Sequence, residues 1–259
     1  MLACSHAGCK GYRLRVAELV GPDTWAIQGE TITLPLSLHD ARLTAAVFTC
    51  PAAGASSVLA PTPLKPLVVG GRAISVLMCI HYGEWPLKAY DEVGVGVFVR
   101  GRPPGLHIVD LPVTGAFTRE AGRDFWGLPK WVMDADLSFA SDRTSVVVRS
   151  AEGAEGAEVM RAEFAHGRRF PGVPAALPAW SYLEEGAQAG RLLRGWLPAR
   201  LSRVRLGRGP FSVRLPSGPG HPMAARMRSL GMLGRPLFTV HAERLSGRLG
   251  SFTPVASRA

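Results

Sequence analysis

The sequence predicts a mainly β protein of the α+β class, and three observations lead to this prediction. The chain of 259 residues contains 30 glycines and 21 prolines, which interrupt it too often for a bundle of long helices. Its apolar residues, 47% of the chain, lie in short runs that suit strands joined by turns. They also supply enough apolar surface for a large core. We therefore expect many short strands and a few short helices.

The first third of the chain predicts one helix followed by two strands. Ser37, with Asp40 three residues later, resembles the capping box that begins a helix, which predicts a short helix over 38–48. The segments 73–80 and 92–100 are rich in β-forming residues and are predicted strands.

The middle of the chain predicts a strand over 106–111 and a helix over 114–125. Gly127 and Pro129 end this helix, because neither residue favours its continuation. A β-hairpin follows, with strands over 144–149 and 159–164 joined by the polar, glycine-containing loop 151–157.

The last third predicts a helix over 181–195, although Gly186 and Gly190 weaken that pattern. The remaining predicted elements are strands over 201–206 and 211–215, a loop over 216–222, a short helix ending at Leu230 and a last strand over 237–244. No internal repeat or linker divides the chain. We therefore expect a flexible tail over 1–12 and a single domain over 13–259.

Cysteine usage and hydropathy indicate a cytoplasmic protein. Apolar stretches such as 73–80 are less than half of the ~20 residues that a membrane-spanning helix needs. The N-terminus lacks the pattern of a secretory signal. Four scattered cysteines suit a reducing compartment. Cys4, His6 and Cys9 offer three zinc ligands, but no nearby residue supplies a fourth, so we expect a tail there and no metal.

Charge is distributed unevenly along the chain. The formal net charge is +10, and residues 191–259 hold thirteen arginines, no lysine and one acid, Glu243. Such a block attracts nucleic acid in some proteins. Here the arginines alternate with apolar residues, as over 201–206, which is typical of a strand with one solvated face. We therefore expect no nucleic-acid partner and no membrane partner.

The segment 120–130 carries the strongest indication of chemistry. It places Lys130 directly after a helix end, a glycine and a Leu-Pro pair, next to an aromatic-rich stretch. Phe125, Trp126, Leu128 and Trp131 are expected to remove water from the amine, which favours its neutral, nucleophilic form. Taken alone, the segment also fits a surface lysine whose stem lies across Trp131.

The run from Gly122 to Lys130 resembles the signature of the acetoacetate decarboxylase family. That signature is a Gly-Arg-Glu, then an aromatic or small residue, then Pro-Lys, and its lysine forms a Schiff base with the substrate. The resemblance implies that Lys130 is the nucleophile, as in the lysine activation known for this family.

Further segments upstream are similar to the same family. Tyr90-Asp91-Glu92 resembles a Tyr-x-Glu whose glutamate lies near the lysine, which implies that Glu92 shuttles a proton or positions the substrate. His81, Tyr90, Trp126 and Trp131 are then candidate substrate-binding residues. The strand ending at His81 and the strand over 106–109 also resemble the family.

The sequence departs from the family at three positions. Many members have a second lysine after the nucleophile, where this chain has Trp131. Gly29 and Val76 stand where an arginine and a further acid are expected. We expect Trp131 to line the pocket and to favour keto acids with larger or more apolar tails than acetoacetate.

The resemblance implies an antiparallel β-barrel-like fold with a few short peripheral helices, a pocket inside the barrel and assembly into homo-oligomers. It implies a lyase that decarboxylates a small keto acid through a lysine iminium, with no cofactor. Two alternatives remain: aldolase or dehydratase chemistry through the same lysine, and a non-catalytic barrel that binds an apolar keto acid or another anion.

Overall fold

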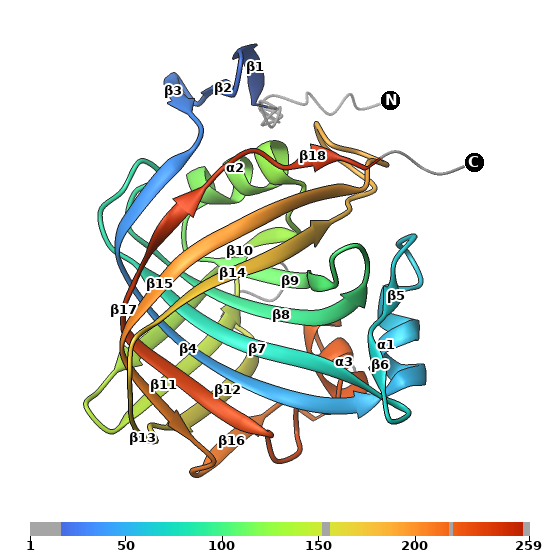
Figure 1. Ribbon diagram of the computed structural model, residues 1–259, viewed down its shortest axis with the longest axis vertical. Helices are drawn as coiled ribbons and strands as arrows, with labels where there is room; N and C mark the ends of the chain where they lie inside the picture. Colours follow the sequence, from blue (N-terminus) through green and yellow to red (C-terminus); the bar gives the residue numbers. More distant parts are fainter. Residues whose placement is uncertain (1–16, 152–155, 218–219, 256–259) are drawn as a thin grey trace, which may run out of the picture.

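A computed structural model describes residues 17–151, 156–217 and 220–255. Seven long strands close into a barrel (Figure 1). In order around the barrel they are β14 (Val173–Ser181), β15 (Leu193–Gly207), β17 (Phe238–Leu249), β4 (Leu36–Pro51), β7 (Arg72–Tyr82), β8 (Tyr90–Arg100) and β9 (Gly105–Val113). The prediction of a mainly β, barrel-like fold is confirmed.

The sheet forks at β9. On one edge this strand pairs with β8, and on the other it pairs first with β14, at Leu106, and then with β10 (Lys130–Phe139), at Leu111. Both pairings on the forked edge are parallel, whereas the other barrel pairings are antiparallel. The expectation of an antiparallel barrel is therefore mostly right, with β9 as the exception.

A second sheet leaves the barrel at this fork. It consists of β10, β11 (Arg143–Ser150), β12 (Glu158–Ala165) and β16 (Phe211–Arg214), all antiparallel to one another. Its apolar face packs on the outside of the barrel, where Phe211 contacts Phe48 of β4 and Phe164 of β12 with ring centroids 5.3 and 5.2 Å apart. The main core lies between these two layers.

One end of the barrel is covered by α2 (Ala116–Trp126) and by a small sheet of β1 (Glu18–Gly21), β2 (Thr24–Ile27) and β3 (Glu30–Thr33) (Figure 1). Trp25 of β2 stacks on Phe125 of α2 with ring centroids 4.9 Å apart, which holds the two together. The remaining elements are α1 (Ala52–Leu59), α3 (Pro222–Ser229), β5 (Lys65–Pro66), β6 (Val68–Val69), β13 (Arg168–Phe170) and β18 (Thr253–Pro254).

Most of the predicted elements are present. The strands predicted over 73–80, 92–100 and 106–111 are β7, β8 and β9, and the helix predicted over 114–125 is α2. The predicted hairpin is β11 and β12. The strands predicted over 201–206, 211–215 and 237–244 lie in β15, β16 and β17, and the short helix ending near Leu230 is α3.

The helix predicted over 38–48 is wrong, because this segment lies within strand β4. Leu43 faces the barrel interior, while Ala46 and Phe48 face the second sheet. A strand buried on both faces loses the clear alternation of apolar and polar residues by which strands are recognised. The segment therefore showed no alternating pattern that would have indicated a strand, and the Ser37 and Asp40 pattern led to the wrong prediction of a helix.

The helix predicted over 181–195 is also wrong. Strand β14 ends at Ser181, a turn follows, and β15 begins at Leu193. Gly186 and Gly190 have φ angles of 97° and 69°, which a right-handed helix cannot contain.

The tail expected over 1–12, with Cys4, His6 and Cys9, lies outside the described residues. No helix among the described residues is long and apolar enough to cross a bilayer.

Candidate active site

Lys130 is the first residue of β10 and lies at the fork of the sheet, next to Leu111. The helix before it ends at Gly127, whose φ of 62° is left-handed, and the amide of Gly127 donates to the carbonyl of Arg123 at 3.0 Å. Such an ending favours glycine. The amide of Lys130 donates to Leu128 O at 2.8 Å, which closes a tight turn around Pro129. The turn fixes the direction in which Lys130 leaves the helix end.

Gly122 makes room for the Lys130 side chain. A Cβ atom on Gly122 would overlap Cδ of Lys130 and lie 2.7 Å from its Cε, closer than real Cβ atoms approach their neighbours. The aliphatic stem of the lysine therefore crosses α2 at the one helical position without a side chain. This contact gives the glycine of the family signature a physical reason.

The amine of Lys130 is enclosed by three acceptors. Its Nζ lies 2.9 Å from Glu92 Oε2, 3.0 Å from the hydroxyl of Thr118 and 3.3 Å from the hydroxyl of Tyr90. The side chains of Lys130 and Glu92 are only 3% and 6% exposed. An ammonium has three N–H donors, so these three acceptors satisfy it completely. The site thus holds a buried acid-base pair within hydrogen-bond distance.

The carboxylate of Glu92 has a second partner in Tyr82. The Tyr82 hydroxyl donates to Glu92 Oε1 at 3.2 Å, and its ring stacks on Tyr90 with centroids 4.5 Å apart. Burial, followed by the charge of Glu92, raises the pKa of both Tyr82 and Tyr90 well above the ordinary value. Both phenols therefore stay protonated and remain hydrogen-bond donors. Trp85 stacks on Tyr82, and its buried indole nitrogen has no hydrogen-bond partner among the described residues.

A cavity of about 320 Å³ opens from this pair into the barrel. Leucines from β4, β9, β14, β15 and β17 make up much of its lining. Among the described lining residues, the only side chains with a formal charge are Lys130, Glu92 and Arg248, and Arg248 is exposed. The cavity therefore has one polar end and an apolar body.

Four of the six predicted site residues line the cavity: Lys130, Glu92, Tyr90 and Trp126. His81 does not line the cavity. Its neighbours on β7, Ile80 and Tyr82, face inward, so the side chain of His81 points outward. There its Nδ1 lies 2.7 Å from Oδ1 of Asp91.

Trp131 also lies outside the cavity, contrary to the expectation that it forms a wall. As the residue after Lys130 on the same strand, it points to the opposite face. There its ring lies 4.5 Å from that of His221, against the main core. Its position in the sequence directly after Lys130 did not reveal the direction of its side chain.

The structure adds two residues that the sequence did not indicate, Tyr82 and Thr118. Tyr82 pairs directly with Tyr90 across β7 and β8, so strand alternation from Glu92 would have selected it in place of His81.

The structure also places Gly29 and Val76, two of the positions at which the sequence departs from the family. Gly29 lies in the turn between β2 and β3, with a φ of 84°. Val76 is buried in the barrel with Leu106 and Ile108.

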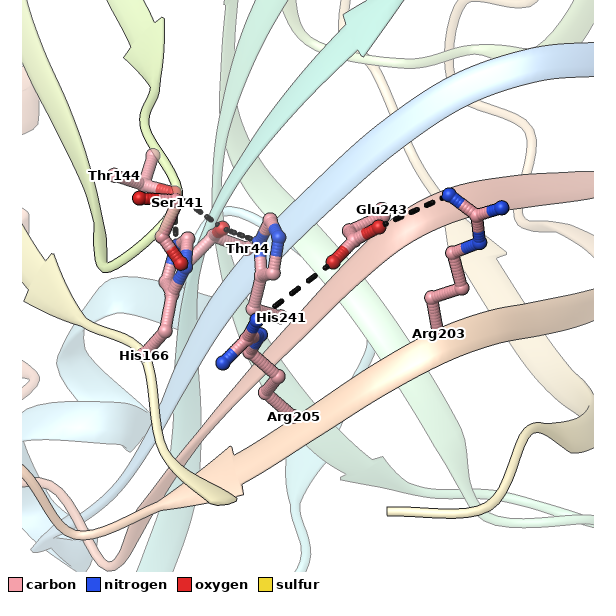
Figure 2. Close-up of polar contacts among 8 residues, drawn as sticks. All are labelled: Thr44, Ser141, Thr144, His166, Arg203, Arg205, His241 and Glu243. Carbon is pink, nitrogen blue, oxygen red and sulfur yellow. Dashed lines mark hydrogen bonds and ion pairs between the residues drawn. The ribbon is translucent and has the colours of Figure 1, made fainter. Parts of the chain in front are cut away.

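A second polar cluster lies on the outer side of the barrel (Figure 2). His166 and His241 stack with ring centroids 3.7 Å apart, and two hydroxyl groups connect them: His166 Nε2 to Thr144 at 2.9 Å, Thr144 to Thr44 at 2.7 Å and Thr44 to His241 Nδ1 at 2.9 Å. Since His166 Nδ1 lies 3.4 Å from the carbonyl of Ser141, this nitrogen carries the proton when the rings are neutral. Each hydroxyl then donates toward His166.

Charged residues border this cluster. Glu243 lies 3.5 Å from Arg203 and 3.9 Å from Arg205, and His241 and Glu243 contribute to a separate surface cavity of about 420 Å³. No lysine or cysteine contributes to its described lining. The Lys130 cavity is therefore the stronger candidate for covalent chemistry.

Comparison with known proteins gives one family and several similar structures. The family model for acetoacetate decarboxylase matches residues 25–243. A search of curated proteins found no match.

A solved structure of acetoacetate decarboxylase has a TM-score of 0.63 at 16% identity, with 86% of this chain and 90% of that chain covered. The acetoacetate decarboxylase of Legionella pneumophila has a TM-score of 0.63 at 15% identity, with 98% of both chains covered. The enduracididine biosynthesis enzyme MppR, with HEPES bound, has a TM-score of 0.65 at 15% identity, with 88% and 90% covered. At these identities the likeness concerns the fold.

Proposed function

The chain belongs to the acetoacetate decarboxylase family, and from this premise we propose that it is a lyase that decarboxylates a 3-oxo acid through a Schiff base on Lys130. The observation that carries the proposal is the buried contact of 2.9 Å between the Lys130 amine and the Glu92 carboxylate at the polar end of an apolar cavity. A lysine with a neighbouring base can be made neutral, and a neutral amine attacks ketones.

The first step forms the iminium. Lys130 passes a proton to Glu92, the free amine attacks the ketone carbon, and the carbonyl oxygen leaves as water after taking up two protons. The net change joins an ammonium and a ketone into an iminium and one water. Thr118 and Tyr90 hold Nζ in place while its protons leave, since both hydroxyls lie within 3.3 Å.

The second step releases carbon dioxide. The bond between the carboxylate and the neighbouring carbon breaks, and its electron pair moves to the iminium nitrogen, which becomes neutral in an enamine. Among the described lining residues only Arg248 is a cation besides Lys130, and it is exposed. A carboxylate in this apolar cavity therefore lacks a buried counter-ion, which disfavours the localised charge more than the spread charge of the transition state.

The last step returns a proton and releases the product. Glu92, which has taken up a proton from solvent and is held by the Tyr82 hydroxyl, gives this proton to the enamine carbon, and water then hydrolyses the iminium. Overall one oxo acid and one proton become a ketone and carbon dioxide. No organic cofactor takes part in these steps, because the iminium accepts the electron pair.

Aldol condensation or dehydration is the second candidate, because the same iminium can lose a proton in place of carbon dioxide. The structurally similar MppR has been solved in complex with pyruvate and with the condensation product of pyruvate and imidazole 4-carboxaldehyde.

Carbon dioxide release from a panel of 3-oxo acids tests the proposal. We expect release by the wild-type protein and none above background by Lys130→Met, a variant of similar length that keeps the stem across Gly122. Condensation of pyruvate with aldehydes without release of carbon dioxide would favour the second candidate. Neither reaction, with ligands still bound, would indicate a binding protein.

A further inference from the structure

We infer that the substrate is a 3-oxo acid with an apolar chain of several carbons on the far side of its ketone. This inference rests on the proposed function, which places the ketone at Lys130. It concerns the part of the cavity that the reacting atoms do not occupy.

The wall facing Lys130 is aliphatic. Around the barrel, β4 and β17 are the strands furthest from β9, beside which Lys130 lies. They contribute Leu38, Leu43, Leu245 and Leu249 to the cavity. A ligand attached at Lys130 and extending across the barrel therefore meets leucines and no charged group among the described residues of these two strands, apart from the exposed Arg248.

Several of these inward side chains keep part of their surface accessible. Leu43, Leu177, Leu197 and Leu201 all line the cavity and are only partly buried, although they face the barrel interior. Covering such surface with an apolar chain is favourable by about 25 cal/mol per Å². A short polar substrate such as acetoacetate offers only a methyl group for this purpose.

The size of the cavity sets the length of the chain. Its volume is about 320 Å³, which at roughly 30 Å³ for each water-sized group holds about ten non-hydrogen atoms. This matches an acid such as 3-oxooctanoate, whose carboxylate and ketone occupy the polar end and whose alkyl chain occupies the rest. Decarboxylation of this acid gives 2-heptanone and carbon dioxide, with one proton taken up.

A chain-length series tests the inference. Each added methylene is worth about 0.8 kcal/mol, or about fourfold in kcat/KM. We therefore expect kcat/KM for carbon dioxide release to rise from acetoacetate through 3-oxohexanoate to 3-oxooctanoate, by about 10²-fold in all. Similar values for acetoacetate and 3-oxooctanoate would overturn the inference and leave the proposed function standing.

Two neighbouring alanines of β14 provide a matched pair of variants. Ala175 lines the cavity, whereas Ala176 does not, and both are exposed, so a phenylalanine at either position is compatible with folding. We expect Ala175→Phe to lower the ratio of kcat/KM for 3-oxooctanoate to kcat/KM for acetoacetate at least tenfold. Ala176→Phe should change neither value. Equal effects of the two variants would contradict the inference.

Binding of 2-heptanone to Lys130→Met, followed by nuclear magnetic resonance, separates the two proposals. We expect Lys130→Met to bind 2-heptanone more tightly than acetone, and we expect the added substitution Ala175→Phe to weaken binding of 2-heptanone. This result supports the apolar chain even if no acid releases carbon dioxide. In that case only the proposed chemistry fails. Equal binding of the two ketones contradicts the apolar chain.

Discussion

Two networks of polar side chains occupy different places in this fold. Their surroundings differ in a way that suits one network to a reaction and the other to stabilising the fold. At the fork of the sheet, Lys130 and Glu92 are enclosed together at the end of an apolar cavity. On the outer side of the barrel, His166 and His241 are connected through the hydroxyls of two threonines.

The difference lies in charge. Burial, then the neighbouring His166 and the arginines Arg205 and Arg42, lower the pKa of His241 to about 4, so this ring is neutral near pH 7. A neutral chain of hydrogen bonds connects β17 and β4 to β11 and to His166, the residue after β12. The Lys130 and Glu92 pair instead offers a proton donor and acceptor next to space for a ligand. Burial of polar groups alone therefore does not identify an active site.

Substitutions in the two networks should have different effects on activity. Glu92→Gln removes the proton acceptor of Lys130, and we expect kcat for carbon dioxide release to fall about 10²-fold or more. His241→Gln should change kcat by less than about threefold and instead lower the melting temperature, because it breaks a buried hydrogen bond worth about 1 kcal/mol. Equal losses of kcat in both variants would place the histidine network in the reaction.

The next effect concerns the passage of Lys130 across α2. Alanine in place of a helical glycine usually stabilises a helix by about 1 kcal/mol. At Gly122 the added methyl group would displace the Lys130 stem, and a shift of about 1 Å costs about 10²-fold in rate. We expect Gly122→Ala to remain folded by circular dichroism but to lose most of its activity. Full activity of Gly122→Ala would show that Lys130 does not need to cross α2 at this position.

A smaller effect is expected at Tyr82, which supports the Glu92 carboxylate. A hydrogen bond to a charged group contributes about 1.5–3 kcal/mol. Tyr82→Phe should therefore lower kcat by about tenfold or more, whereas Tyr182→Phe, outside the cavity lining, should leave it unchanged. Kinetics at saturating substrate measure this, and identical values for both variants would remove Tyr82 from the proton path.

The histidine network predicts how stability depends on pH. The folded pKa of His241 is about 4, below its value of about 6.5 in the unfolded chain. As pH falls below 6.5 the unfolded state binds the proton first, so stability is lost between pH 6.5 and 4, by up to about 3 kcal/mol. His107, whose pKa burial also lowers to about 4, adds a similar loss.

Urea unfolding of wild type and His241→Gln at several pH values measures the contribution of this residue. The variant should be less stable at pH 7 and should lose less stability on acidification. Parallel curves would mean that His241 takes up its proton at the same pH in the folded and the unfolded protein.

The strongest predictions from the sequence came from local patterns. The turn over 127–130 was readable because glycine, proline and the lysine lie next to each other. The face of the sheet to which each strand side chain points could not be predicted, because successive side chains along a strand point to opposite faces. This is why His81 and Trp131 were selected while Tyr82 was missed.

Long-range packing limited the remaining predictions. The role of Gly122 depends on how α2 packs against β10, and the strand β4 depends on layers that cover both of its faces. Neither arrangement leaves a local pattern. The apolar cavity likewise arises from residues on all seven barrel strands, which only the closed barrel brings together with Lys130 of β10.

Reductive trapping shows whether Lys130 forms a Schiff base with a ketone. The protein is incubated with 3-oxooctanoate or 2-heptanone and borohydride, digested, and analysed by peptide mass. We expect one adduct, on the peptide that contains Lys130, with the mass of the reduced ketone conjugate, and no adduct in Lys130→Met. An adduct on an exposed residue such as Lys88 with none at Lys130, or no adduct with any 3-oxo acid that the protein decarboxylates, would contradict the account.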